Sequence, residues 1–255
     1  MQFAYLGSGS KGNAALIEAG DTCLILDCGF SVRETLTRLA RLDRTGEELD
    51  AILVTHEHSD HVAGVGVLAR KLKLPVWATA GTWRAIEQRI GDIPQRNIVD
   101  HHSPFTIGDI EVTPFPVPHD AKEPVQYVFS DGNVRLGILT DVGQSTPHIE
   151  EMLSGCDSLA LECNHDYQML MQGPYPASLK ARVTSPQGHL DNDTAAKLLS
   201  RLDTSRLQHL IAVHLSETNN TPELAKAALR SAFDCDEAFI QVADQKLGLP
   251  WHAIS

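Results

Sequence analysis

A short apolar run that passes directly into a cluster of histidines constrains this chain more than any other feature. Residues 52–54 read Ile-Leu-Val, and residues 55–61 read Thr-His-Glu-His-Ser-Asp-His. The apolar run predicts a buried β-strand, so the polar residues should form a loop at the carboxyl end of that strand. The chain must therefore fold into a sheet that holds this loop on a rigid support.

This loop carries donor atoms that suit metal ions. His56, His58, Asp60 and His61 fall within six residues, and imidazole and carboxylate groups both bind zinc or manganese. The short spacing allows alternate residues to face different ions, which predicts two divalent metal ions, Zn or Mn. A polar turn without function is the alternative, but it does not account for three histidines and an aspartate in one turn.

Length and composition favour a single cytoplasmic domain. The chain of 255 residues is long enough to bury one large core. Its five cysteines are scattered and form no Cys-x-x-Cys pair, which predicts reduced thiols. No apolar run approaches the roughly 18 residues of a membrane span, and no basic leader precedes the first turn, so we predict no membrane association.

The charge of the chain weighs against a nucleic-acid partner without excluding one. The formal net charge is −12, whereas phosphate backbones select basic surfaces. Bound metal ions would cancel part of this charge locally, and the basic residues are clustered. Each cluster is expected on a solvated helix face. The clusters are Arg33, Arg38, Arg41 and Arg44; Arg70, Lys71 and Lys73; Arg84, Arg89 and Arg96; and Lys180 with Arg182.

A glycine-rich turn near the start has the composition of an anion-binding loop. Residues 7–13 read Gly-Ser-Gly-Ser-Lys-Gly-Asn, and such a turn presents backbone N–H groups together with side-chain donors. An ordinary hairpin turn is an equally good interpretation. We treat Ser8, Ser10, Lys11 and Asn13 as candidate substrate-binding residues. The turn does not match the Walker pattern.

Polar residues also follow other predicted strands. The strand-end residues are Asp27 after 22–26, Asp141 after 134–139, Glu162 after 158–161 and His214 after 210–213. Helices are expected at 32–42, 62–73, 81–90, 147–153, 194–202 and 222–233. A lid-like piece of helix and loop is expected at 167–183. Strands that alternate with helices predict an α/β sandwich.

The run His-x-His-x-Asp-His at 56–61 resembles the hallmark of the metallo-β-lactamase superfamily. The resemblance implies an αββα four-layer sandwich over residues 1–255, with the metal site at one edge. Matched by position, the implied ligands are His56, His58 and His119 for the first ion, Asp60, His61 and His214 for the second, and Asp141 as the bridge. His165, His189 and His209 are alternatives to His214, which its strand-end position favours. Asp27 matches the aspartate that supports the metal-bound histidines from behind.

Proton transfer is assigned by the same resemblance. Gly188-His189 before a helix resembles the motif that supplies the general acid in tRNase Z-like nucleases, and Glu162 matches its supporting acid. A hydroxide bridging the two ions would attack a phosphodiester, and His189 would protonate the leaving alkoxide. Asp60 is counted as catalytic as well as a ligand. A helix-capping role without chemistry is the alternative for His189.

The whole chain resembles the YycJ/WalJ group of small metallo-β-lactamase-fold proteins. The motifs that carry this resemblance lie at 6–13, 27–29, 55–61, 117–121, 139–141, 162–166, 188–190, 214–216 and 219–220. It implies a metal-dependent phosphodiesterase, namely a DNA exonuclease acting from the 5′ end, with the 8–13 turn and His165 against the substrate. Lys11, Cys163 and Glu217-Thr218 depart from the pattern of the group.

Other functions stay open on the sequence alone. A hydrolase for small phosphodiesters or cyclic nucleotides suits the acidic charge. A tRNase Z-like ribonuclease is disfavoured, because no gap between the motifs is long enough for the large inserted domain of that branch. A thioesterase has less use for His189, because a thiolate leaves readily. A non-catalytic interaction protein is disfavoured by the intact ligand set.

Overall fold

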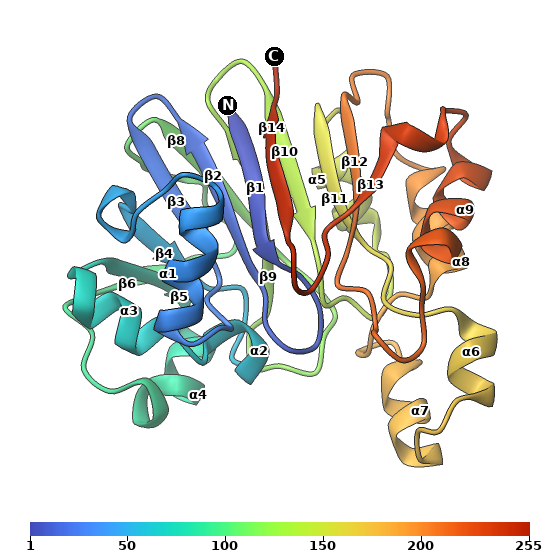
Figure 1. Cartoon of the computed structure of the whole chain (residues 1–255), viewed down its shortest axis with the longest axis horizontal. Helices are drawn as coiled ribbons and strands as arrows, with labels where there is room; N and C mark the ends of the chain where they lie inside the picture. Colours follow the sequence, from blue (N-terminus) through green and yellow to red (C-terminus); the bar gives the residue numbers. More distant parts are fainter.

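The computed structural model describes residues 1–255, apart from the side chain of Glu237. Two seven-stranded sheets dominate it (Figure 1). The first sheet contains, in spatial order, β14 (Leu249–Ala253), β1 (Gln2–Gly7), β2 (Ala14–Ala19), β3 (Thr22–Leu26), β4 (Ala51–Leu53), β5 (Pro75–Thr79) and β6 (Gln95–Val99). The second contains β13 (Ile240–Val242), β12 (His209–Val213), β11 (Ser158–Glu162), β10 (Arg135–Leu139), β9 (Val125–Ser130), β8 (Ile110–Pro116) and β7 (Phe105–Ile107).

Alternation along the strands explains how the layers pack. In β3, Leu24 joins the apolar cluster between the two sheets, whereas Ile25 joins the cluster beneath the outer helices. In β11, Ala160 faces the space between the sheets and Leu161 faces the outer helices. Strands that are buried on both faces read as continuous apolar runs, as these do. Three apolar clusters thus separate four layers, and the predicted αββα sandwich is confirmed.

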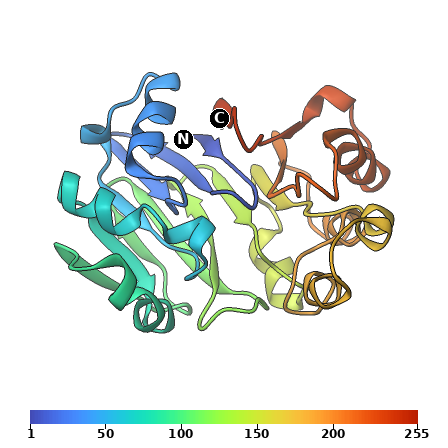
Figure 2. The ribbon, with the colours of Figure 1, turned by 60° about the horizontal axis from the view of Figure 1, so that its bottom comes forward.

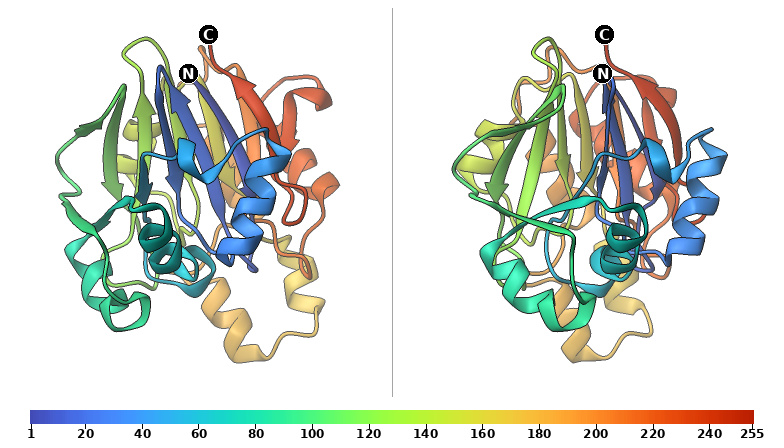
Figure 3. Two further views of the ribbon diagram at one scale, coloured as in Figure 1. Left: turned by 60° about the vertical axis from the view of Figure 1, so that its left-hand side comes forward. Right: turned by 90° about the vertical axis from the view of Figure 1, so that its left-hand side faces the viewer.

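Helices cover the outer face of each sheet (Figure 2). The first sheet is covered by α1 (Val32–Arg41), α3 (Val65–Leu72) and α4 (Ala80–Ile90), and the second by α5 (Pro147–Leu153), α8 (Asn192–Leu199) and α9 (Pro222–Ala232). The expected lid-like piece forms α6 (Tyr167–Gln172) and α7 (Ala177–Val183), which project beyond the sheets (Figure 3). In the part of the chain that the structure describes, every helix is too short or too polar to cross a bilayer.

The helix expected at 62–73 is instead two helices. The first, α2 (Ser59–Val62), begins inside the metal loop, and α3 follows after Ala63 and Gly64. A Cβ at Gly64 would lie 2.1 Å from the carbonyl oxygen of Phe30, so the chain needs glycine there to pass close to the loop after β3. This tertiary contact interrupts the helix.

Arg38 corrects the expectation that the arginines of α1 are solvated. Its side chain is buried, and one guanidinium nitrogen donates to the carbonyl oxygens of Leu6 (2.7 Å) and Gln245 (2.9 Å). The guanidinium also lies over the ring of Phe30, 4.0 Å from its centroid. Arg38 therefore fixes the end of β1, where the glycine-rich turn begins.

The topology brings the predicted polar strand ends to one edge of the sandwich. Strands β3 to β6 run parallel to one another, and so do β10 to β13. The carboxyl ends of both parallel sets point to the bottom of Figure 1, where α2, α6 and α7 lie. Ligands that are far apart in sequence can therefore meet between the two sheets.

Candidate metal centre

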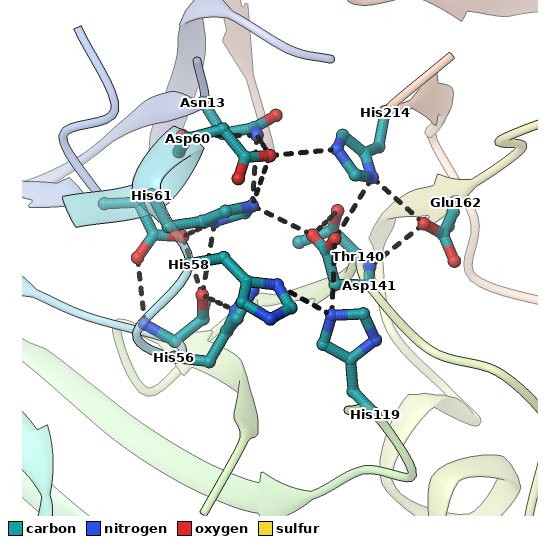
Figure 4. Close-up of polar contacts among 12 residues, drawn as sticks. Asn13, His56, His58, Asp60, His61, His119, Thr140, Asp141, Glu162 and His214 are labelled. Carbon is teal, nitrogen blue, oxygen red and sulfur yellow. Dashed lines mark hydrogen bonds and ion pairs between the residues drawn. The ribbon is translucent and has the colours of Figure 1, made fainter. Parts of the chain in front are cut away.

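Seven side chains converge at this edge in two groups (Figure 4). Each group offers ligand atoms that all lie within 4.8 Å of one another. The first ligand group is His56, His58 and His119, and the second is Asp60, His61 and His214. Asp141 lies within reach of both groups, because it is close to His56 of the first and to His61 and His214 of the second. These groups coincide with the ligand sets implied by the sequence. Binding of ions by these particular residues remains a prediction.

Most of the imidazoles are held through Nδ1, which leaves Nε2 facing the centre. His61 Nδ1 lies 2.8 Å from Asp27 Oδ2, and His214 Nδ1 lies 3.0 Å from Glu162 Oε1. His119 Nδ1 donates to the carbonyl oxygen of Gly188 at 3.0 Å. A partner on one ring nitrogen fixes the tautomer and ring orientation of a metal ligand.

Unsatisfied polar atoms show that the site fits metal ions. Nε2 of His56 and Nε2 of His214 are buried and have no hydrogen-bond partner among the described residues. Such atoms are costly to bury unless something binds them. Burial, together with the neighbouring His61, holds the pKa of His56 well below its ordinary value. The ring is therefore in the neutral form that coordinates a metal.

Three of the site residues lie in the left-handed backbone region. The φ angles are 60° at Asp27, 51° at Asp141 and 57° at His214. Each of these residues directly follows a strand or lies one residue beyond its end. The conformation turns the chain sharply, and aspartate, asparagine and histidine tolerate it better than other side chains with a Cβ.

The metal loop is fixed by close backbone contacts. The N–H of Asn13 donates to the carbonyl oxygen of Asp60 at 2.8 Å, and the N–H of Cys28 donates to that of His61 at 2.8 Å. A Cβ at Gly29 would lie 1.7 Å from the Asp60 oxygen. The glycine after Asp27-Cys28 is thus required so that the loop can approach the β3 end.

Glu162 connects the metal centre to His189. Its carboxylate is fully buried and accepts hydrogen bonds from the backbone N–H groups of Asp141, Val142 and Leu190. Nδ1 of His189 lies 2.9 Å from Glu162 Oε1. Burial alone would raise the pKa of Glu162. The histidine neighbours, chiefly His189, have the larger opposite effect and lower this pKa to about 2. Burial lowers the pKa of His189, yet Glu162 and Asp141 raise it above its ordinary value.

The glycine-rich turn supports the site from the inside. Ser8 and Asn13 are buried; the Ser8 hydroxyl accepts from the N–H of His214 at 2.8 Å, and Asn13 Nδ2 lies 3.1 Å from His61 Nε2. These contacts position two predicted ligands. Phosphate binding by Ser8 and Asn13 stays a prediction beside this supporting role.

The other predicted substrate residues differ in accessibility. Ser10 is exposed beside the site, in the same pocket as His189. The Lys11 ammonium forms an ion pair with the carboxylate of Glu217. His165 is 1 % exposed and lies against Asn164, and the structure does not bring it into either ligand group.

Several residues near the site were missed by sequence reasoning. Asp120 Oδ1 is buried without a hydrogen-bond partner, 3.4 Å from His119 Nε2 and 3.6 Å from His58 Nε2. Its other oxygen accepts from Arg182 Nε at 2.6 Å. Adjacency to His119 was the available signal for Asp120, but Arg182 comes from α7 and had no such signal.

Comparisons with known proteins agree with this geometry. The family model described as the beta-lactamase superfamily domain matches residues 22–215. This chain belongs to the metallo-β-lactamase superfamily. The exodeoxyribonuclease YycJ of Bacillus anthracis is 39% identical to this superfamily member over 255 residues, which cover 97% of each chain. The exodeoxyribonuclease WalJ of Streptococcus pneumoniae is 38% identical over 228 residues, which cover 88% of this chain and 85% of the relative.

A solved structure confirms the fold of this superfamily member. The metallo-β-lactamase fold protein YhfI from Bacillus subtilis superposes with a TM-score of 0.77, at 18% identity, over 98% of each chain. The predicted superfamily, the YycJ-like group and the fold are therefore confirmed. The chain is a metal-dependent hydrolase, and its His and Asp groups suit divalent ions.

Proposed function

We propose that this protein is an exodeoxyribonuclease that degrades DNA from the 5′ end and holds two divalent ions, zinc or manganese. Relatives that match it over most of its length are named exodeoxyribonucleases. The two ligand groups and the bridging position of Asp141 support two ions rather than one. The proposal includes a single domain that works in the cytoplasm, which the five free cysteines support.

The observation that carries the proposal is the His189–Glu162 pair beside the ligand groups. When bound, two divalent ions supply a hydroxide nucleophile at neutral pH and neutralise the oxygens of a phosphodiester. The leaving alkoxide of a phosphodiester then needs a proton. Glu162 holds Nδ1 of His189, which leaves Nε2 to carry that proton toward the substrate. Asp60, the other predicted catalytic residue, would hold the second ion together with His61 and His214, and His189 would serve the leaving group.

Degradation of end-labelled strands tests this function. DNA and RNA labelled at either end are incubated with the protein in Zn or Mn, and the products are separated by size. We expect 5′-labelled DNA to yield labelled mononucleotide first. His189→Ala should lower kcat by about 10²- to 10⁴-fold, because general acid catalysis contributes about that much.

His148 provides a matched control for His189. It lies on α5 and is largely exposed, so His148→Ala should leave the rate unchanged. DNA that stays intact, or undiminished digestion by His189→Ala, would contradict the proposal.

A hydrolase for small phosphodiesters or cyclic nucleotides is the second candidate. The observation in its favour is the formal net charge of −12, which repels long polyanions. Turnover of bis-p-nitrophenyl phosphate by a preparation that leaves every polynucleotide intact would support this candidate over the nuclease.

A further inference from the structure

A pocket of about 230 Å³ opens beside His189, between α7 and the loop after β12. Its lining includes Ser10, Tyr175, Leu179, Arg182, His189 and Asn219. Its volume is close to the lower end of the range for small-molecule sites, roughly 300–1,000 Å³. A pocket of this size suits one nucleotide and excludes a duplex.

The two walls of this pocket differ in chemistry. Tyr175, Leu179 and Val183, from the segment that contains α7, form an aromatic and aliphatic wall. The lining also includes Asn219, which is 1 % exposed and whose Oδ1 is buried without a hydrogen-bond partner among the described residues. An unpaired buried oxygen of a pocket residue is an acceptor that a ligand can satisfy.

Arg182 brings positive charge to the rim of the pocket. Its guanidinium pairs with Asp120 through Nε, and the side chain remains 59% exposed. No described residue accepts from its two terminal nitrogens, which can therefore bind a phosphate. Asp120 in turn faces the ring nitrogens of His58 and His119. The guanidinium therefore lies next to the first ligand group.

The end of α7 is tied directly to the loop that carries His189. The N–H of His189 donates to the carbonyl oxygen of Val183 at 2.9 Å. A Cβ at Gly188 would lie 2.1 Å from the same oxygen, so only glycine permits this approach. A group bound against α7 is consequently held at a fixed place relative to His189.

We propose that this pocket binds the terminal nucleotide of the strand, with its base against Tyr175 and its 5′-phosphate against Arg182. The proposal rests on the function proposed above. It specifies that the terminal nucleotide is the part of the substrate that enters the pocket. The proton of His189 goes to the leaving group. Because His189 lines the pocket, the leaving O3′ lies at its mouth and the nucleoside that bears O3′ lies inside.

The reaction that follows releases one nucleotide at a time. A water oxygen forms a bond to phosphorus, and the P–O3′ bond breaks with its electron pair left on O3′. His189 gives O3′ a proton, and the proton lost by the water restores His189. The products are a nucleoside 5′-monophosphate with a free 3′-hydroxyl and a strand that is one nucleotide shorter and carries a new 5′-phosphate.

Binding of thymidine 5′-monophosphate, measured by titration calorimetry, tests the pocket without any turnover. Arg182→Ala should weaken this binding by at least about tenfold, because it removes a charge-assisted contact. Tyr175→Ala should weaken it by about 5- to 100-fold, and Tyr175→Phe should retain it, because stacking requires the ring and not the hydroxyl. The same Arg182 and Tyr175 variants should raise KM for 5′-labelled DNA more than they lower kcat.

The chain offers a matched control for each variant. Arg201 is also 59% exposed and also pairs with a carboxylate, that of Glu150, but it does not line the pocket. Tyr167 lies on α6 outside the pocket and is 49% exposed. Arg201→Ala and Tyr167→Ala should bind the nucleotide like the wild type.

The outcomes separate the pocket from the proposed function. Nucleotide binding that depends on Arg182, in a protein that leaves DNA intact, would support the pocket and reject the exonuclease. DNA degradation by a protein that does not bind the nucleotide, or whose Arg182→Ala variant binds it equally well, would overturn the pocket and leave the exonuclease standing.

Discussion

Asp27 illustrates how one carboxylate can organise a metal site without binding metal. Its two oxygens accept from the N–H and the hydroxyl of Thr55, each at 2.9 Å, and Oδ2 also lies 2.8 Å from His61 Nδ1. Asp27 thus ties the end of β3 to the start of the metal loop after β4. The contact with His61 also holds that ring in the tautomer whose Nε2 faces Asp141 and Asp60.

Asp27→Ala should lower the affinity for the second metal ion by about 10- to 100-fold, because partners of this kind contribute about that much. The affinity is measured by calorimetry with Zn or Mn on metal-free protein. Asp43→Ala is the control, since Asp43 also has a positive φ, of 55°, but is exposed in a loop. An equal loss of affinity in both variants would show that backbone strain, and not the carboxylate, is responsible.

At this scale the sequence predicts residue types better than side-chain directions. The ligand groups could be expected because His and Asp at a strand end have few other uses. The directions of the Ser8 and Asn13 side chains could not be predicted, because a turn of small polar residues has the same composition whether its polar groups face solvent or His61 and His214. Asn219 belongs to the motif at 219–220, but its unpaired Oδ1 becomes apparent only in the folded chain.

An ion pair between Glu18 and Arg44 joins neighbouring elements at the end of the sandwich that lies opposite the candidate metal centre. Glu18, on β2, accepts from Arg44 Nε at 2.6 Å and from Arg44 Nη2 at 2.9 Å, and Gln2 of β1 donates to the same carboxylate at 2.7 Å. This paired contact fixes the segment after α1 against two strands. Burial raises the pKa of Glu18, but the contacts with Arg44 and Gln2 outweigh it and leave the pKa below the ordinary value of 4.5.

A lowered pKa in the folded state predicts how this contribution depends on pH. The contribution of the Glu18 carboxylate to the free energy of unfolding is complete above the ordinary pKa of 4.5. This contribution is lost as the pH falls through the lower pKa that Glu18 has in the folded protein. Glu18→Gln should therefore lower the free energy of unfolding at pH 7 by about 1–3 kcal/mol. The gap from the wild type should narrow below pH 4.5, as measured by urea unfolding over a pH series.

The Glu150–Arg201 ion pair serves as the control for the Glu18–Arg44 pair. It is a single contact at 2.9 Å between more exposed side chains, so Glu150→Gln should change stability by less than about 1 kcal/mol. A Glu18 effect that is the same at every pH would contradict the assigned charge contact.

Most elements were predictable, and the exceptions have tertiary causes. Continuous apolar runs identified β3, β4, β10, β11 and β12 because those strands are buried on both faces. β6 and β14, the two edge strands of the first sheet, were missed because their patterns are interrupted by exposed positions, as expected of edge strands. The break between α2 and α3 depends on the contact of Gly64 with the loop after β3, which the local sequence does not show.

The whole molecule gathers its predicted metal ligands from both sheets, between His56 and His214. Divalent ions bound there would cross-link the two halves of the sandwich. A ligand that binds only the folded state adds about 2.7 kcal/mol of stability at a concentration of 100 times its Kd. We therefore expect the occupied centre to stabilise the fold as well as to support the chemistry.

Chelation of the metals should lower Tm by on the order of 10 °C, because two ions together contribute about 5 kcal/mol and each kcal/mol shifts Tm by about 2–4 °C in a chain of this size. Differential scanning calorimetry with and without a chelator measures the shift, and readdition of Zn or Mn should reverse it. Glu18→Gln should show the same shift, since its contact is remote from the centre. An unchanged Tm after complete metal removal would be inconsistent with ions that bridge the sheets.

The left-handed strand ends at Asp141 and His214 restrict how this enzyme could be re-engineered for another metal. A replacement at these positions must provide the donor atom and also tolerate a positive φ, which roughly limits the choice to Asp, Asn and His. Cysteine, the usual route to softer metals, would add about 1–2 kcal/mol of backbone strain at each position. His58 has an ordinary extended backbone, with φ of −63° and ψ of 148°. Metal preference is therefore more readily altered from the loop at His58 than from the strand ends.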